Sequence, residues 1–396
     1  MTTTINNEHK KLNVPNLRFP EFQGEGEKFK LSDLCTFFSG GTPSSSNKDF
    51  YGGDIAFIRS GELHADSTEL FISQDGYDNS SAKMVEIGDL LLAMYGATSG
   101  DIAISKIKGA INQAILCIRT NQNKKFIESV WNKHVSKILR KYLQGGQGNL
   151  SADIVKGISF SFPTLEEQER IANLISLLDE RIATQNKIIE DLKKLKSAII
   201  EKHYSQVKKQ TTCIADLGEP FSVGSLAKDD LAEIGSPCVI YGELFTTYGE
   251  IIFHIESYTN KTDGMILSKK GDLLFPSSTT VDAMSLIAPS VINVDGVILG
   301  GDMFGIHISH NYNAQYLSYY FNHIAKKQLA KFAKGSTIIH LHYTDIEKAK
   351  LLLPSLEEQN RMAKCLVALD KKVSVEQNLL SSLTCQKSFL LQQMFI

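Results

Sequence analysis

Two pairs of adjacent glutamates, Glu166–Glu167 and Glu357–Glu358, carry the side chains that general acid–base catalysis uses. Each pair follows a proline and a helix-capping residue, Thr164 or Ser355, and precedes a long amphipathic stretch. Carboxylates in the first turn of a helix are stabilised by the helix dipole, so these glutamates have a structural explanation. We interpret them as helix-start charges and not as catalytic acids.

Other catalytic patterns are missing from the 396 residues. The sequence contains no P-loop, dinucleotide-binding glycine fingerprint, zinc-protease motif, serine-hydrolase elbow or Asn-Pro-Pro-aromatic tetrapeptide of adenine methyltransferases. His340 and His342 lie near Asp345, but no further ligand follows at a spacing suited to a metal. The six cysteines are far apart and form no C-x-x-C pair. We predict a chain with no catalytic site and no metal or cofactor of its own.

Several loops combine glycine with small polar side chains, which suits close approach to a sugar–phosphate backbone and bonding to base edges. They cover residues 39–48 and 95–100 in the first half and 224–228 and 277–280 in the second. Ordinary surface loops have the same composition, so that alternative stays open. The residues of these loops that we assign to DNA contact are Thr42, Ser44, Ser45, Asn47, Lys48, Tyr95, Ala97, Thr98, Ser99, Ser225, Lys228, Ser277, Ser278 and Thr279, and we assign Arg59, outside the loops, to the same role.

A lysine-bearing helix followed by a glycine-containing polar segment also occurs twice. The predicted helices are Phe126–Leu143 and its counterpart Ala314–Phe332. Lysines that bind phosphates would position the neighbouring base contacts, whereas a solvated lysine face is the alternative. The residues assigned to DNA contact in these two regions are Lys137, Lys141, Gln144, Gln147, Asn149, Lys331, Lys334, Ser336 and Thr337.

An internal repeat organises these candidates. The segment P-T-L-E-E-Q-E-R-I-A at Pro163 returns as P-S-L-E-E-Q-N-R-M-A at Pro354, a displacement of 354 − 163 = 191. Upstream, Gly-Asp-Leu-Leu at Gly88 returns at Gly271, a displacement of 271 − 88 = 183. The repeat predicts two units of one plan, each a part with mixed helices and strands followed by a long helix.

Each long helix carries an apolar seam with alternating steps of three and four, as in a coiled coil. About forty helical residues span roughly 60 Å and overhang a domain of this size, although two independent surface helices are the alternative. The polar interruptions also correspond, because Lys196 maps to Lys387, and polar seam residues fix register and orientation. The predicted seam residues are Ile175, Leu178, Ile182, Ile189, Leu192, Leu366, Leu369, Val373, Leu380 and Leu383.

The composition is that of a globular protein, with 42% hydrophobic and 22% charged residues. The balance of 42 basic and 44 acidic residues gives −2, which by itself does not indicate a nucleic-acid binder. The sequence has no apolar run that could span a bilayer and no signal peptide at its start. We expect a cytoplasmic protein without a membrane partner.

The repeated P-x-L-E-E-Q-x-R-[IM]-A segment, the Gly41–Ser44 loop, the Tyr51–Ile55 turn and the Gly-Asp-Leu-Leu strands resemble the specificity (S) subunit of Type I restriction-modification enzymes. The likeness runs from about Phe29 to residue 396. It implies two target recognition domains that each read half of a bipartite site in double-stranded DNA. It also implies that the two helices form an antiparallel coiled coil with pseudo-twofold symmetry, which sets the spacer. One departure is Gly224-Ser225-Leu226-Ala227, which stands where the first half has the Gly41–Ser44 loop.

The resemblance further implies partner subunits. Two methyltransferase (M) subunits would dock on the helices and methylate adenine at N6 with S-adenosylmethionine. Two restriction (R) subunits would use ATP with Mg to complete the nuclease.

We predict an α+β fold in five parts: an N-terminal segment 1–27, recognition domain 28–162, central spacer helix 163–206, recognition domain 211–353 and C-terminal spacer helix 354–396. The predicted function is non-catalytic, sequence-specific DNA recognition within a Type I complex. One alternative is a self-contained nuclease or methyltransferase with an unfamiliar site, which activity of the purified chain would reveal. A second is a coiled-coil scaffold that binds no DNA, which a competition experiment with duplex DNA would test.

Overall fold

The computed structural model describes residues 14–142 and 150–396. The chain divides into two compact units. Unit 1 contains the described residues up to Asn186 together with Asn378–Ile396, and unit 2 contains Lys187–Gln377. The two long helices, α5 (Leu165–Gln206) and α11 (Leu356–Met394), each contribute one segment to each unit. Within the described residues, no helix is both long and apolar enough to cross a membrane.

Unit 1 is built on two four-stranded sheets, with strand orders β2-β9-β6-β7 and β4-β3-β8-β5. All neighbouring strands are antiparallel except β3 and β8. The elements are β1 (Glu27–Lys30), α1 (Leu31–Leu34), β2 (Cys35–Ser39), β3 (Tyr51–Ile58), β4 (Phe71–Ile72), α2 (Gln74–Asp78), β5 (Lys83–Val85), β6 (Leu90–Ala93), β7 (Ile102–Ile104), β8 (Gly109–Ile111), β9 (Ile115–Thr120), α3 (Lys124–Tyr142), α4 (Ala152–Gly157) and β10 (Ser159–Phe162).

Unit 2 repeats this arrangement with two five-stranded sheets, β12-β22-β18-β20-β15 and β13-β16-β14-β21-β17. Its one parallel pair in the second sheet, β14 and β21, corresponds to β3 and β8. The elements are β11 (Gln210–Cys213), β12 (Gly218–Ser222), β13 (Leu231–Ala232), β14 (Ser236–Ile240), α6 (Glu243–Thr246), β15 (Ile251–Ile252), β16 (Ser257–Thr259), β17 (Ile266–Leu267), β18 (Asp272–Pro276), β19 (Ser278–Thr279), α7 (Ala283–Leu286), β20 (Ser290–Ile292), β21 (Ile298–Gly300), β22 (Met303–Ile308), α8 (Ala314–His323), α9 (Lys326–Leu329), β23 (Ile339–His340), α10 (Tyr343–Ile346) and β24 (Lys350–Leu353).

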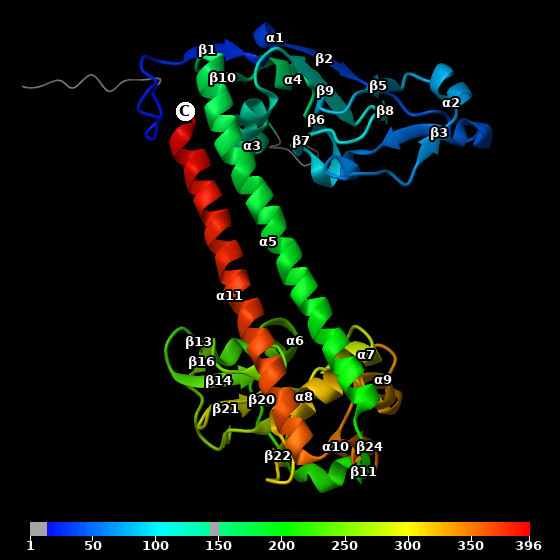
Figure 1. Ribbon diagram of the computed structural model, residues 1–396, viewed down its shortest axis with the longest axis vertical. Coiled ribbons are helices and arrows are strands. Elements are labelled where there is room, and N and C mark those ends of the chain that lie inside the picture. Colours follow the sequence, from blue (N-terminus) through cyan, green and yellow to red (C-terminus); the bar gives the residue numbers. More distant parts are fainter. Residues whose placement is uncertain (1–13, 143–149) are drawn as a thin grey trace, which may run out of the picture. The chain divides into compact units, whose positions relative to one another are not determined.

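A two-stranded ribbon closes each globular part where its long helix begins or ends. In unit 1, β1 pairs with β10, which leads directly into α5 (Figure 1). In unit 2, β11 follows α5 and pairs with β24, which leads into α11. The two displacements found in the sequence appear here again: β1 maps to β11 at 210 − 27 = 183, and β10 maps to β24 at 350 − 159 = 191.

The segments of α5 and α11 pack antiparallel inside each unit. In unit 1, Ile171 and Ile175 of α5 share one apolar cluster with Leu390 and Met394 of α11. In unit 2, Ile200 near the end of α5 shares a cluster with residues at the start of α11. All ten predicted seam residues are buried or half-buried, whereas Leu177, beside the seam, is 64% exposed. These side chains are therefore shielded from solvent, as a helix seam requires, and the assignment of single residues to the seam stays a prediction.

The helix expected over residues 314–332 is wrong as a single element. The backbone N–H groups of Ile324 and Ala325 both donate to the carbonyl oxygen of Tyr320, at 2.8 and 2.9 Å. Two donors on one carbonyl interrupt the regular hydrogen-bond ladder, so α8 ends there and α9 starts anew. Its counterpart α3 is continuous over Lys124–Tyr142, and Leu143 lies outside the described residues.

Candidate nucleic-acid interface

The structure brings two of the predicted loops of unit 1 to one edge of the domain. The turn between β8 and β9 joins them: its Asn112 carbonyl accepts a hydrogen bond from Gly40 N–H at 3.3 Å, and its Ala114 carbonyl accepts one from Met94 N–H at 2.8 Å. The side chain of Thr42 also donates to Gln113 Oε1 at 2.7 Å. Loop 39–48 and loop 95–100 are thus anchored on the same turn, although about fifty residues separate them in sequence.

Loop 95–100 is held rigidly against helix α3. The indole N–H of Trp131, fully buried, donates to the carbonyl of Gly100 at 2.8 Å. Gly100 has a φ of +89°, and a Cβ there would lie 2.8 Å from Val135 Cγ2, so only glycine fits. Ser99 Oγ donates to the carbonyl of Met94 at 3.0 Å, which closes the loop on itself. A loop fixed in this way presents its outer side chains in one arrangement.

The exposure of the unit 1 candidates is mixed. In loop 95–100, Ala97 is exposed and Tyr95, Thr98 and Ser99 are half-buried. In the other loop, Asn47 is half-buried and its side chain accepts from Asp49 N–H at 3.1 Å. The exposed candidates of that loop are Thr42, Ser44, Ser45 and Lys48.

Arg59 is exposed but already has a partner. Its guanidinium makes two hydrogen bonds to Glu62, at 2.7 and 3.2 Å. The hydrogen bond from Arg59 is the main reason that the pKa of Glu62 falls to about 2. Arg59 would have to exchange this carboxylate for a phosphate in order to contact DNA.

The basic residues of α3 lie apart from these loops. Exposed Lys137 and Lys141 line a pocket of about 530 Å³ together with Lys28 and the strand residues Ser159 and Ser161. Val135 and Leu139, which face Gly100, lie on a different side of the helix, because a step of two residues turns an α-helix by about 200°. The structure therefore does not join the lysine face of α3 to the loop edge. Gln144, Gln147 and Asn149 lie outside the described residues.

Unit 2 has the same anchoring turn. Between β21 and β22, Gly301 N–H donates to the Gly224 carbonyl at 3.0 Å, and the Asp302 carbonyl accepts from Ser277 N–H at 2.7 Å. The second contact matches that of Met94 in unit 1, whereas the first joins the turn to the other loop, as Gly40 does in unit 1, but with the turn residue as the donor. Loop 224–228, whose Ser225 and Lys228 are exposed, and loop 277–280 are consequently anchored together. The departure from the Gly41–Ser44 sequence leaves this anchoring contact in place.

In unit 2 a third predicted segment, residues 331–337, lies at the same edge as the two loops. β19, which contains Ser278 and Thr279, pairs with β23, and His340 of β23 exchanges backbone hydrogen bonds with Lys334 at 2.7 and 2.9 Å. Lys334 Nζ lies 2.5 Å from Asp345, which lowers the pKa of that carboxyl. Among the other candidates, Ser277 and Ser278 are buried and Thr279 is half-buried. The exposed candidates of this segment are Lys331, Lys334, Ser336 and Thr337.

A pocket of about 630 Å³ opens beside loop 277–280. Its lining combines the aromatic side chains of Tyr241 and Phe245 with Ser278, Thr279 and Lys326. Aromatic rings, hydroxyls and a cation are the types of groups that contact bases and phosphates. Within the described parts of the chain, no group of three or more histidine, cysteine, aspartate and glutamate side chains is arranged to hold a metal ion.

The repeated segment has a role that the sequence did not reveal. Gln168 accepts from Asn123 N–H at 3.2 Å and donates to Pro163 O at 2.9 Å. Its equivalent Gln359 accepts from Asn313 N–H at 3.0 Å and donates to the carbonyl of its own preceding proline at 2.9 Å. Both glutamines are 1% exposed. Each therefore ties the start of a long helix to the start of α3 or α8. The only sequence signal was the repetition itself.

The capping interpretation of the repeated segment is confirmed, with one addition. Thr164 and Ser355 accept from the N–H groups of Glu167 and Glu358 at 3.4 Å, as N-caps do. Glu167 is also buried and binds the Arg18 guanidinium through two hydrogen bonds of 2.7 Å. This glutamate therefore fixes the segment before β1 in addition to its place in the helix dipole.

Comparison with known proteins places these features in a family context. Residues 24–194 and 207–384 match the family model described as Type I restriction modification DNA specificity domain. The specificity subunit of the Type I restriction enzyme MjaVIII from Methanocaldococcus jannaschii is 23% identical over 392 residues, covering 91% of this chain and 89% of that one. The putative MjaX specificity subunit of the same organism is 25% identical over 404 residues, covering 93% and 92%.

Solved structures share the fold. The S subunit of a Type I restriction-modification system from M. genitalium superposes with a TM-score of 0.64 at 16% identity, covering 97% of this chain and 99% of that one. A chain from a structural study of the assembly of the type I R-M system gives a TM-score of 0.57 at 15% identity, covering 95% and 99%.

Proposed function

The chain belongs to the family of Type I restriction-modification DNA specificity proteins, and from this membership we propose that it reads a bipartite site in double-stranded DNA. The observation that carries the proposal is the repeated edge. In each unit a turn between two strands anchors two glycine- and hydroxyl-rich loops, through Gly40 and Met94 in unit 1 and Gly224 and Ser277 in unit 2. Two equivalent edges with different side chains suit two half-sites of different sequence. As a specificity subunit, the chain contributes recognition and not catalysis.

We assign the reading domains to residues 28–162 and 211–353. The ribbons β1–β10 and β11–β24 support these limits, because each ribbon closes the backbone of one domain. The spacer helices then occupy 163–206 and 354–396, with residues 1–27 as a separate N-terminal segment. A rigid helix pair between two readers would keep the half-sites a fixed distance apart.

Base readout falls to the anchored loops. Hydroxyl and amide side chains bond base edges, and the loops of unit 1 offer Thr42, Thr98 and Asn47 for this purpose. In unit 2, Thr279 and the exposed Ser336 and Thr337 take this role. Ser277 and Ser278 are buried, so we assign them to positioning the loop backbone and not to direct contact.

Phosphate contact falls to the exposed lysines. Lys48 and Lys228 are the last residues of two anchored loops, and Lys331 and Lys334 belong to the third segment of unit 2. Such contacts fix the protein on the duplex without reading its sequence. Lys137 and Lys141 would bind phosphates at a separate place, beside strand β10.

Methyltransferase subunits are the expected partners, as in a Type I complex. Two such subunits fit the repeat, because Ile188 and Leu379, at equivalent positions 379 − 188 = 191 apart, are 38% and 37% exposed on the long helices. Exposed apolar side chains at repeated positions suit two copies of one partner. S-adenosylmethionine would be bound by those subunits, and ATP with Mg by two restriction subunits.

Methylation assays test the proposal. The methyltransferase subunit that pairs with this chain is incubated with DNA and S-adenosylmethionine, with and without the chain, and N6-methyladenine is mapped by sequencing. We expect methylation at one bipartite site only when the chain is present, and none from the chain alone. Methylation that is unaffected by omitting the chain would overturn the proposal.

A further inference from the structure

A lysine of each long helix forms an ion pair with an aspartate of the other helix. In unit 2, Lys196 Nζ of α5 lies 2.8 Å from Asp370 of α11. In unit 1, Lys387 Nζ of α11 lies 2.5 Å from Asp179 of α5. A displacement of 191 positions converts Asp179 into Asp370 and Lys196 into Lys387, so the two pairs are equivalent in the repeat.

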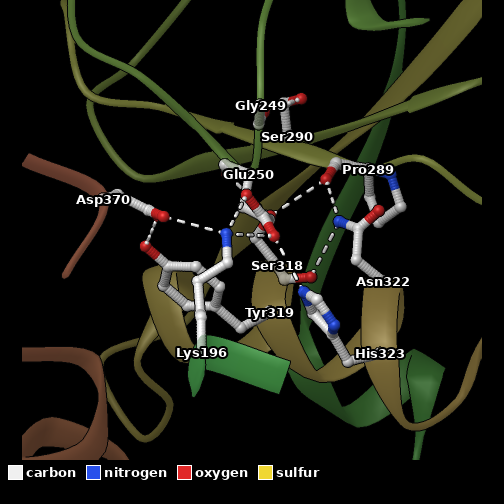
Figure 2. Close-up of polar contacts among 10 residues, drawn as sticks. All are labelled: Lys196, Gly249, Glu250, Pro289, Ser290, Ser318, Tyr319, Asn322, His323 and Asp370. Carbon is white, nitrogen blue, oxygen red and sulfur yellow. Dashed lines mark hydrogen bonds and ion pairs between the residues drawn. The ribbon is translucent and has the colours of Figure 1, made fainter. Parts of the chain in front are cut away.

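In unit 2 the pair extends into the globular domain (Figure 2). Lys196, whose side chain is 12% exposed, also contacts both carboxylate oxygens of Glu250, at 2.9 and 3.1 Å. His323 Nε2 of α8 lies 2.8 Å from Glu250, and the hydroxyl of Tyr319 donates to Asp370. Burial opposes ionisation of Glu250, but the hydrogen bond with His323 and the charge of Lys196 lower its pKa to about 2. The network thus joins α5, α11 and the domain.

Unit 1 contains the corresponding network with different domain residues. Lys125 of α3 lies 2.8 Å from Asp179 and 2.5 Å from Glu128. Asp179 of α5 therefore contacts both Lys387 of α11 and Lys125 of the domain. In the same way Asp370 contacts both Lys196 of α5 and Tyr319 of the domain in unit 2. In both units one polar cluster connects three elements: α5, α11 and a domain helix, which is α3 after β9 in unit 1 and α8 after β22 in unit 2.

These pairs favour one alignment of the helices. Sliding one helix along the other by seven residues keeps apolar seam residues opposite each other but moves the charged partners about 10 Å apart. The residues that would then face Lys196 are Ala363 or Gln377, and those that would face Lys387 are Ala172 or Asn186. Lys387 would then lose its acid, whereas Lys196 would keep Glu250 alone. A half-buried lysine that loses a carboxylate partner is destabilised, because its lost hydration is no longer offset.

The two units differ in what else holds the helices together. In unit 2 both helix segments are joined to one domain by short connections, because α5 ends at Gln206 just before β11 and α11 begins at Leu356 just after β24. In unit 1 only α5 has such a connection, to β10. Residues 378–394 of α11 are separated along the chain from the rest of unit 1 by all of unit 2. Apart from the continuity of α11 itself, only non-covalent contacts hold this segment in unit 1.

We propose that the Lys387–Asp179 and Lys196–Asp370 pairs are register locks of the helix pair, and that the unit 1 lock fixes the spacer length which the protein accepts between its two DNA half-sites. This inference rests on the proposed function. The lysines and aspartates are positioning residues, because they act through the alignment of α5 and α11 and not by touching DNA.

Lys387→Met is the sharpest test. It removes the link between the helices while Asp179 keeps Lys125 as a partner, so the domain remains tied to α5. The full chain, assembled with its methyltransferase subunits, is assayed on duplexes whose half-sites are separated by the preferred spacing and by one to three base pairs more or less. We expect the preference for one spacing to fall by about tenfold, with unchanged base preference within each half-site.

Three further variants keep the test decisive. Asp179→Asn should lower the preference for one half-site spacing as much as Lys387→Met does. The double variant should lower it no further than either single variant, because both changes remove the same ion pair.

Lys387→Arg should retain the wild-type spacing preference, because it keeps the positive charge. Lys196→Met should change it less than threefold, since the short connections still align the helices in unit 2, and Asp370 and Glu250 keep Tyr319 and His323.

Leu390→Ala is the matched control. It removes seam packing in unit 1 but no charge, so it should lower thermal stability without relaxing the spacing. A Lys387→Met complex that assembles and keeps the wild-type spacing preference overturns the inference alone. A wild-type complex whose methylation does not depend on the two half-sites overturns the proposed function instead.

Discussion

The two units share one frame, which consists of two sheets, a two-stranded ribbon and the segments of the two long helices. The units differ in the segments that follow β6 in unit 1 and β18 in unit 2. Between β6 and β7 the chain has residues 94–101, which are 8 residues, and between β18 and β20 it has residues 277–289, which are 13. This difference, 13 − 8 = 5, accounts for most of the change in displacement between the two ends of the domains, 191 − 183 = 8. In unit 2 the added length forms β19 and α7. The insertion falls at the edge assigned to DNA reading and spares the strands that support it.

The comparison teaches that support and recognition are separated in each unit. Gln168 and Gln359 make nearly the same hydrogen bonds. In both units the anchoring turn also bonds to both loops, although Asn112 accepts from its loop and Gly301 donates to its loop. By contrast, loop 95–100 is held by an indole of α3, whereas loop 277–280 is held by strand β23. A shared frame with different loops would allow the two units to recognise different sequences, as proposed above.

The largest expected effect comes from breaking the frame. Leu178→Asp in unit 1 and Leu369→Asp in unit 2 each place a carboxylate in the apolar packing of the helices. We expect a loss of about 3 kcal/mol or more in the free energy of unfolding, with loss of methyltransferase docking. Thermal unfolding and co-purification measure both. Leu177→Asp, at a 64% exposed neighbouring position, is the control and should leave both unchanged. Normal assembly of the Leu178→Asp variant would contradict a paired-helix frame.

The next effect distinguishes the two charge networks by pH. The pKa of Glu250 falls from its ordinary value of 4.5 to about 2, so its stabilisation is fully present above about pH 4.5 and is lost as the pH falls towards 2. The stability gap between wild type and Glu250→Gln should therefore narrow by up to about 3 kcal/mol over this range. Hydrogen exchange of α8 amides measures unit 2, and Trp131 fluorescence reports unit 1 as the internal reference. A gap that is constant with pH would argue against an ionised Glu250 facing Lys196, His323 and Asp370.

A smaller expected effect, on base preference, distinguishes the recognition domains of units 1 and 2. Thr98→Ala should alter base preference only in the half-site read by unit 1, and Thr279→Ala only in the other, because each hydroxyl belongs to one anchored loop. The expected change is about 1 kcal/mol, or roughly fivefold, in relative methylation of altered sites. Libraries with each half-site randomised give the readout, and Thr184→Ala on α5 is the control. If either variant changed both half-sites equally, the assignment of one loop to one half-site would be wrong.

The smallest effect concerns phosphate contact away from the loop edge. Lys141→Ala should weaken binding equally for all sequences and reduce the slope of log affinity against log salt by about 1. Binding titrations at several salt concentrations test this, with exposed Lys193→Ala on α5 as the comparison. A change in base preference would indicate that Lys141 lies closer to the base edges than its place beside β10 indicates.

Local patterns in the sequence predicted the frame well. The seam from Ile175 to Leu383, the caps at Thr164 and Ser355 and the strand near Gly-Asp-Leu-Leu are all local or periodic features, which short-range physics fixes. The helix over 314–332 was the exception, because its break at Tyr320 leaves no proline or glycine in the sequence. The assignment of single residues to DNA contact stays a prediction.

By itself, the sequence determined that the chain is a duplicated plan with two long seamed helices, since periodicity and repetition survive without any knowledge of contacts. It also placed Lys196 and Lys387 within the seam. Only the tertiary structure decided their partners, Asp370 and Asp179, which lie on the other helix and far away in the chain. The same holds for the turns that bring the loops to one edge. Such pairings depend on how strands and helices meet in three dimensions, and no local pattern encodes that.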